Sequence, residues 1–187
     1  MNSFALFTDV SLDPQLKIGL GAYVVVPASF LNVSSDSIEK SHVAELLRIQ
    51  RFDDTSSTKL EVQTVLWALE NFRKEFKISG AVRLHVYCDS QCVAGLPARR
   101  AELEFNNFQS KGRNRRLKNA ALYRKFYEFY DEPGFELIKI SGHAPSCSHD
   151  AAQRIFSFVD REVRKALRLL IQDFKPDSIK GLKTQKK

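Results

Sequence analysis

Acidic residues occupy four positions of this 187-residue chain where the surrounding pattern predicts inward-facing apolar side chains; they are Asp9, Glu61, Asp89 and Asp160. A buried carboxylate without a partner is costly, and several together become protonated unless a cation joins them. Divalent cations with oxygen ligands meet this need, and Mg²⁺ is typically held by a few carboxylates together with substrate phosphate. Two such ions roughly 4 Å apart can activate a water molecule and stabilise the leaving oxygen of a phosphodiester.

Each acid also has an ordinary structural explanation that spacing alone leaves open. Glu61 could complete a capping box with Thr58 and satisfy a helix-start N–H. Asp89 could be a turn residue at the end of its strand, and Asp160 could pair with Arg164 along one helix. The position of the four acids on four separate elements makes the catalytic interpretation more persuasive, but spacing alone does not bring them together.

Hydrophobic periodicity predicts the elements that must bring the acids together. Apolar runs predict strands over 4–10, 20–26, 81–88 and 135–140. Spacings of three and four and capping residues predict helices over 58–76, 90–96, 117–130 and 151–173. Turns are expected at Asp13-Pro14 and Pro133-Gly134, and loops over 27–41 and 141–149, whereas 42–52 fits either a strand or a helix.

The order of these elements predicts an α/β fold with a mixed sheet, in which three meandering strands come first and crossover helices follow. The first strand is apolar on both faces, which predicts a central position in the sheet. We expect one domain over 1–173, followed by a basic, frayed tail over 174–187.

The net charge of +7 is concentrated in one segment. Residues 99–125 hold nine basic and two acidic side chains, whereas residues 1–98 have a net charge of −2 and residues 126–172 a net charge of −1. A local basic patch on a near-neutral body suggests a polyanion partner such as nucleic acid. A solvated basic loop is the alternative.

Composition narrows the class of protein. Apolar residues make up 43% and charged residues 27% of the chain, which is typical of a globular domain rather than a disordered one. No apolar run approaches the ~18 residues of a membrane helix, and the first residues lack the pattern of a signal peptide. Three cysteines without a Cys-x-x-Cys pair favour a reduced, cytoplasmic compartment and no zinc site.

Five motifs in chain order resemble those of type 1 ribonucleases H: FTDVS, SSTKLEV continuing into LWALE, YCDSQCV, SGHA and FVDREVRKAL. Together they span nearly all of 4–170, and their order is far more specific than any one of them. The resemblance implies a ribonuclease H-like five-stranded mixed sheet flanked by helices. It also implies Mg²⁺-dependent hydrolysis of the RNA strand of RNA–DNA hybrids by two metal ions, with Mn²⁺ a possible substitute.

The resemblance assigns roles to the acids and to one histidine. Asp9 matches the aspartate that bridges two metals, Glu61 and Asp89 match further ligands, and Asp160 matches the ligand of the ion that positions water. His143 matches a loop histidine that assists proton movement or product release, a role that suits its ordinary pKa range.

The fourth ligand is open to one alternative. A helix that begins near residue 151 puts Asp160 in its third turn and leaves Asp150, just before the helix, as a rival. The spacing from His143 to Asp160 is also wider than the family's. The motif FVDREVRKAL favours Asp160.

The same resemblance implies a nucleic-acid interface. The expected contacts of the body are Ser11, Ser57, Thr58 and Gln91, and 99–125 corresponds to a basic protrusion that grips the DNA strand with Lys111, Arg113, Arg115, Arg116 and Lys118. Phe105, Phe108 and Tyr123 could pack on sugars or bases, or form a small core beneath the loop, which is the expectation for Tyr123. The chain departs from the family at LDPQLKIGLG, which replaces a Gly- and Asn-rich turn.

The leading hypothesis is a monomeric cytoplasmic endonuclease acting on RNA–DNA hybrids. One alternative keeps the fold but changes the substrate to duplex RNA or DNA, because the turn after the first aspartate is altered. Another is a non-catalytic hybrid- or RNA-binding module. Four retained carboxylates argue against the latter, because negative charge beside phosphate weakens binding.

Overall fold

A five-stranded mixed sheet forms the centre of the computed structural model, which describes residues 2–76, 82–110, 115–141 and 150–174. In the order β3-β2-β1-β4-β5, its strands are β3 (Arg48–Phe52), β2 (Ile18–Pro27), β1 (Asn2–Asp13), β4 (Val82–Cys88) and β5 (Phe135–Lys139). β1 pairs antiparallel with β2 and parallel with β4. The mixed sheet and the central position of the first strand are therefore confirmed.

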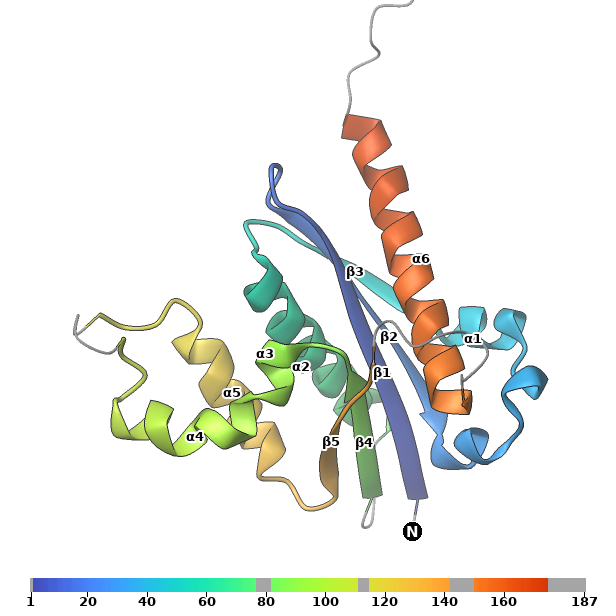
Figure 1. Ribbon diagram of the computed structural model, residues 1–187, viewed down its shortest axis with the longest axis horizontal. Coiled ribbons are helices and arrows are strands. Elements are labelled where there is room, and N and C mark those ends of the chain that lie inside the picture. The colour runs from blue at the N-terminus through green and yellow to red at the C-terminus, as the bar shows by residue number, and fades with distance from the viewer. Residues whose placement is uncertain (1, 77–81, 111–114, 142–149, 175–187) are drawn as a thin grey trace, which may run out of the picture.

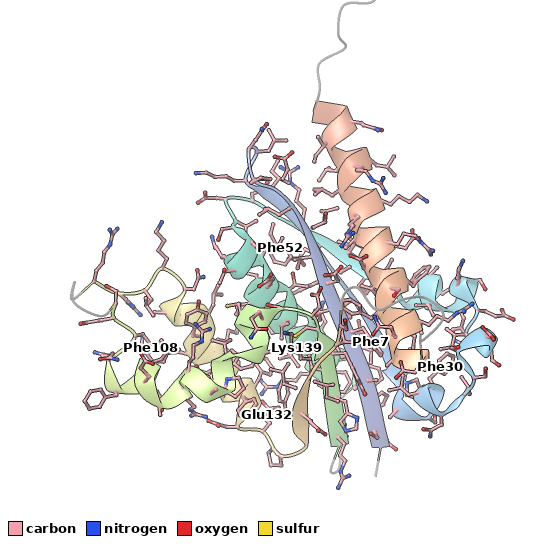
Figure 2. The ribbon with its side chains drawn as sticks, viewed as in Figure 1. Phe7, Phe30, Phe52, Phe108, Glu132 and Lys139 are labelled. Atoms are coloured by element: carbon pink, nitrogen blue, oxygen red, sulfur yellow. The ribbon has the colours of Figure 1, made fainter. Side chains whose placement is uncertain are left out.

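Helices cover both faces of the sheet (Figure 1). One face carries α2 (Ser57–Glu75), α3 (Gln91–Ala94), α4 (Leu96–Phe105) and α5 (Ala120–Tyr130). The other face carries α6 (Ala151–Phe174), α1 (Lys40–Leu46) and the 3₁₀ turns η1 (Ala28–Asn32) and η2 (Ser35–Ser37). Alternation along β1 explains both layers, because Leu6 packs toward α2 whereas Ala5 and Phe7 pack toward α6. Phe7 is labelled in Figure 2.

Three segments differ from their sequence predictions. Residues 42–52 are neither all strand nor all helix, because α1 ends at Leu46 and β3 begins at Arg48. The loop expected over 27–41 contains η1, η2 and the start of α1. The predicted helix 90–96 divides at Gly95, and α4 continues into the basic segment. Pro97 does not interrupt α4, because it stands in the first turn, where its missing N–H is not needed.

Both predicted turns are present. Asp13 Oδ1 accepts the backbone N–H groups of Gln15 and Leu16, each at 2.9 Å, and so closes the β1–β2 hairpin. Gly134 has a φ of +86°, and its carbonyl accepts the Leu84 N–H at 2.8 Å. Within the described part of the chain, no helix is both long and apolar enough to cross a membrane.

Two glycines of β2 let α2 lie directly on the sheet. A Cβ atom on Gly21 would stand 2.1 Å from Thr64 Oγ1, and one on Gly19 would stand 2.4 Å from Leu60 Cδ2. Larger residues would therefore push the first turns of α2 outward. This close approach fixes the distance of Glu61 from the sheet, because Glu61 lies between Leu60 and Thr64 on α2.

Candidate active site

The β1–β4 register places two of the acids at the same level of the sheet. Parallel pairing ends with Phe7 opposite Tyr87, and Asp9 and Asp89 each follow two residues later. β4 ends at Cys88, whereas β1 continues beside β2, so the two carboxylates lie where adjacent strands separate. Asp9 is 8% exposed and Asp89 is exposed.

Glu61 reaches this point from the second turn of α2. Its Oε2 accepts the Ser90 hydroxyl at 2.6 Å, and its Oε1 accepts the Ser57 hydroxyl at 3.4 Å. Ser90 Oγ also accepts the Val93 N–H at 3.1 Å and thereby caps α3. The capping-box explanation of Glu61 is wrong, because the α2 N-cap is Ser56 and has no side-chain capping bond.

Asp160 approaches the site from the opposite layer. Its carboxyl lies within hydrogen-bonding range of the Asp9 carboxyl. On its other side, Asp160 Oδ1 pairs with Arg164 Nη2 at 2.7 Å, as the helical alternative expected. The rival acid, Asp150, instead caps α6, because its Oδ1 accepts the Gln153 N–H at 2.8 Å.

Burial and crowding raise the pKa of Asp9 to about 8. Burial is the largest cause, followed by the Asp160 carboxyl, whose contact with Asp9 requires a shared proton unless a cation is present. The negative charge of Asp89 adds to the shift, and a hydrogen bond to the Val10 backbone opposes it. No donor among the described residues reaches the buried Oδ2 of Asp9.

A small cavity of about 10 Å³ lies between three of the acids, Asp9, Glu61 and Asp89, and Ser90 also lines it. This is about the space of one water-sized sphere. Oxygen donors, a buried carboxylate oxygen without a partner and a raised pKa together fit a hard divalent cation. Among the described residues, no three His, Cys, Asp or Glu side chains already form a ligand set, so ion binding requires side-chain adjustment.

Cys88 takes no part in such a set. It is 2% exposed, and burial raises the pKa of its thiol to about 12. A thiolate ligand is therefore disfavoured. The prediction that Cys88 is a core thiol is confirmed.

The residues outside the basic segment that we expect to contact nucleic acid lie on β1, α2 and α3, the first two of which also carry acids of the site. Ser11 lies two residues beyond Asp9 on β1 and faces α6. Ser57 is exposed and Thr58 half-buried at the start of α2. Gln91 is exposed at the start of α3, where its Oε1 accepts Lys139 Nζ. His143 lies outside the described residues.

The basic segment contains arginines with structural roles. Arg100 joins α4 to the end of α5, because it pairs with both Asp131 and Glu104. Arg124 donates to Asn107 Oδ1 at 3.0 Å, and its guanidinium carbon lies 4.4 Å from the centre of the Phe108 ring. These contacts hold α4, α5 and their connection together.

Other basic side chains of the segment face solvent. Arg115, Arg116 and Lys118 are exposed, and a bridge between Gln109 and Arg116 shapes the backbone that carries them. Lys111 and Arg113 lie outside the described residues.

The aromatic residues of the segment divide in the same way. Phe108 (labelled in Figure 2) and Tyr123 are 5% and 7% exposed and belong to the hydrophobic core on the α2 face of the sheet. Phe105, at the end of α4, is 91% exposed. The core role expected for Tyr123 is therefore confirmed.

Comparison with solved structures shows a ribonuclease H-like fold. The structure titled LC9-RNase H1, a type 1 RNase H with the type 2 active-site motif, matches with a TM-score of 0.59 and 16% identity over 88% of this chain and 72% of that one. A foamy viral protease-reverse transcriptase in complex with RNA/DNA hybrid matches with a TM-score of 0.53 and 11% identity over 88% of this chain and 19% of that one. A structure of the foamy viral protease-reverse transcriptase in complex with dsDNA matches with a TM-score of 0.52 and 14% identity over 87% of this chain and 95% of that one. No family model and no curated protein matches the sequence.

Proposed function

We propose that the protein is a Mg²⁺-dependent endonuclease that hydrolyses the RNA strand of RNA–DNA hybrids. The observation that carries this proposal is the approach of acids from β1, β4, α2 and α6 to one end of the central strands. Without a cation this arrangement is electrostatically unfavourable, which argues for a role beyond folding.

The acids Asp9, Glu61, Asp89 and Asp160 would hold the metal ions. When bound, such ions lower the pKa of a water molecule and stabilise the leaving oxygen of a phosphodiester. The chain itself positions the ligands. Ser90 orients Glu61, and Asp9 gives up the proton that its raised pKa retains at neutral pH.

Substrate contacts come from both sides of the cleavage site. Arg115, Arg116 and Lys118 supply positive charge for the phosphate backbone. Hydroxyl and amide groups at Ser11, Ser57, Thr58 and Gln91 would hydrogen-bond the RNA strand, whose 2′-OH distinguishes it from DNA. In this proposal His143 assists proton movement or product release.

A cleavage assay with labelled RNA–DNA hybrid, duplex RNA and duplex DNA tests the proposal. We expect Mg²⁺-dependent cleavage of the hybrid, and a loss of at least about a hundredfold in Asp9→Asn and Asp160→Asn. Asp150→Asn retains activity, because Asp150 caps α6. Asp36→Asn is the matched control, because Asp36 lies on η2 with a 91% exposed side chain.

Each other outcome has a distinct meaning. Hybrid binding without cleavage by the intact chain contradicts the enzyme and supports a binding module. Cleavage confined to duplex RNA or DNA contradicts the substrate. Loss of activity in Asp150→Asn with full activity in Asp160→Asn overturns the assignment of the fourth ligand.

A further inference from the structure

A basic groove lies beside the acids, on the side away from the protrusion. It has a volume of about 500 Å³ and lies between the far part of β1, at Ser11, and residues 160–171 of α6. Arg161, Arg164 and Arg168 line its helical wall. Their spacing of three and four puts them on one face of the helix. Asp160 lines the same groove, so the groove opens onto the candidate active site.

The arginines retain hydrogen-bonding capacity. The Arg161 and Arg164 side chains are 50% and 55% exposed. Arg164 pairs with Asp160 at 2.7 Å, and Arg161 pairs with Glu162 at 3.2 Å. Arg168 Nε donates to the Arg164 carbonyl at 3.4 Å. Each guanidinium carries five N–H donors, so these contacts leave donors for an anion in the groove.

We propose that this groove binds the phosphate backbone of the nucleic acid as it leaves the acidic site. The proposal rests on the proposed function, because the acids mark the position of the reacting phosphate. Arg164 and Arg168 stand four and eight residues beyond Asp160, which is about 6 and 12 Å along the helix axis. That length spans several phosphates of one strand.

The charge and shape of the groove favour nucleic acid as its occupant. Three guanidinium groups face one lining carboxylate, and the planar guanidinium fork suits phosphate oxygens. The apolar lining residues, Leu167 and Ile171, are at most partly exposed. Figure 1 shows α6 and the α4–α5 protrusion on opposite sides of the sheet, so the two basic regions flank the acids.

Equilibrium binding of labelled RNA–DNA hybrid, duplex RNA and duplex DNA tests the groove. The measurements use fluorescence anisotropy in Mg²⁺, with Asp9→Asn present in every protein so that cleavage does not interfere. We expect Arg161→Gln combined with Arg168→Gln to weaken binding of the preferred duplex roughly tenfold at moderate salt. The slope of log Kd against log salt should fall by about 1 for each arginine.

The matched control removes equal charge outside the groove. Arg83→Gln combined with Lys165→Gln changes two exposed residues, one on β4 and one on α6, that do not line it. This control should weaken binding less than twofold and leave the salt slope unchanged. Thermal unfolding checks that both double variants are folded.

The outcomes separate this inference from the proposed function. If the two double variants change the Kd and the salt slope equally for every duplex, the proposed role of the groove is wrong, even if the intact chain cleaves hybrid. A selective effect of the groove variant supports the groove, even if the intact chain cleaves nothing. Failure to bind any of the three duplexes, or binding only to vesicles of phosphatidylserine and phosphatidylcholine, overturns it.

Discussion

Asp9 and Asp160 form a carboxyl pair that is stable only when a proton or a cation lies between them. Asp9 is buried, its Oδ2 lacks a donor among the described residues, and Asp160 contacts it from α6. The partner of Asp160 along the helix, Arg164, satisfies one side of this pair but not the buried oxygen of Asp9. In the metal-free protein this arrangement therefore has an electrostatic cost, which the proposed cation would relieve.

We predict that this cost appears as a pH dependence of stability. Burial and Asp160 raise the pKa of Asp9 from its ordinary value of 3.8 to about 8. Between these values the folded state holds a proton that the unfolded state releases. The free energy of unfolding of the metal-free protein should therefore fall as the pH rises from about 4 to 8.

Thermal unfolding in EDTA checks this prediction. Asp9→Asn should raise the Tm at pH 8. It should also remove most of the dependence of the unfolding free energy on pH, a change of up to about 5 kcal/mol between pH 4 and 8. Added Mg²⁺ at pH 8 should stabilise the intact chain more than Asp9→Asn. Asp36→Asn is the control and should leave the profile unchanged. Parallel profiles for the intact chain and Asp9→Asn would contradict the prediction.

The Ser90 hydroxyl has two roles that substitutions can separate. Ser90→Ala removes both the cap of α3, worth about 1 kcal/mol, and the donor to Glu61. We expect activity to fall roughly tenfold or more and the Mg²⁺ requirement to rise, because Glu61 loses its orientation. Ser90→Thr keeps the hydroxyl and should retain most of the activity. Ser90→Ala with lowered stability but an unchanged Mg²⁺ profile would show that Ser90 is a cap alone.

At the scale of the elements, the candidate active site depends on how closely α2 approaches β2. We predict that Gly21→Ala lowers the free energy of unfolding by about 1–3 kcal/mol, because its Cβ would overlap Thr64. The strain also shifts the start of α2 and with it Glu61, so hybrid cleavage should fall. Chemical denaturation and the cleavage rate measure the two effects.

A double-variant cycle tests the cause of that strain. Thr64 Oγ1 is buried and has no hydrogen-bond partner among the described residues, so Thr64→Ala breaks no hydrogen bond within that part of the chain. It removes two of the three atoms nearest the new Cβ of Gly21→Ala. The combined variant should lose less unfolding free energy than the sum of the losses in the two single variants. Strict additivity would show that the loss has another origin.

The sequence predicts best the elements whose pattern is local. Alternation and apolar runs identify β1, β2, β4 and β5 within a few residues, and the spacing of three and four identifies α2 and α6. The segment 42–52 is ambiguous because it contains two short elements joined at Leu47. α4 escapes prediction because its arginines and Pro97 suggest a solvated loop.

The site is only partly predictable for a related reason. The four acids stand out on inner faces, but their approach to one another depends on the β1–β4 register and on the layers of α2 and α6. Ser90 is predictable as a helix cap from its position, whereas its bond to Glu61 joins residues 29 positions apart. The resemblance to ribonucleases H supplies the long-range arrangement that local patterns lack.

For the whole molecule, the net charge of +7 conceals two kinds of basic residue. Arg100 and Arg124 are half-buried and hold the protrusion together through carboxylates and an amide. Arg115 and Arg116 instead extend from its surface. Composition cannot separate these groups, because both contribute equally to the local charge. The exposed arginines are the more accessible ones for a polyanion.

This division predicts opposite phenotypes for substitutions within one basic segment. Arg115→Gln combined with Arg116→Gln should raise the KM for hybrid and lower the salt slope of binding by about 2, with little change in Tm. Arg100→Gln should lower the Tm, because Arg100 links α4 to Asp131 at the end of α5. Its effect on the salt slope should be smaller per charge, because its guanidinium is already committed to two carboxylates. Equal changes in the salt slope per charge removed, together with equal changes in Tm, would contradict this division, because a paired arginine would then contribute to binding as much as an exposed one.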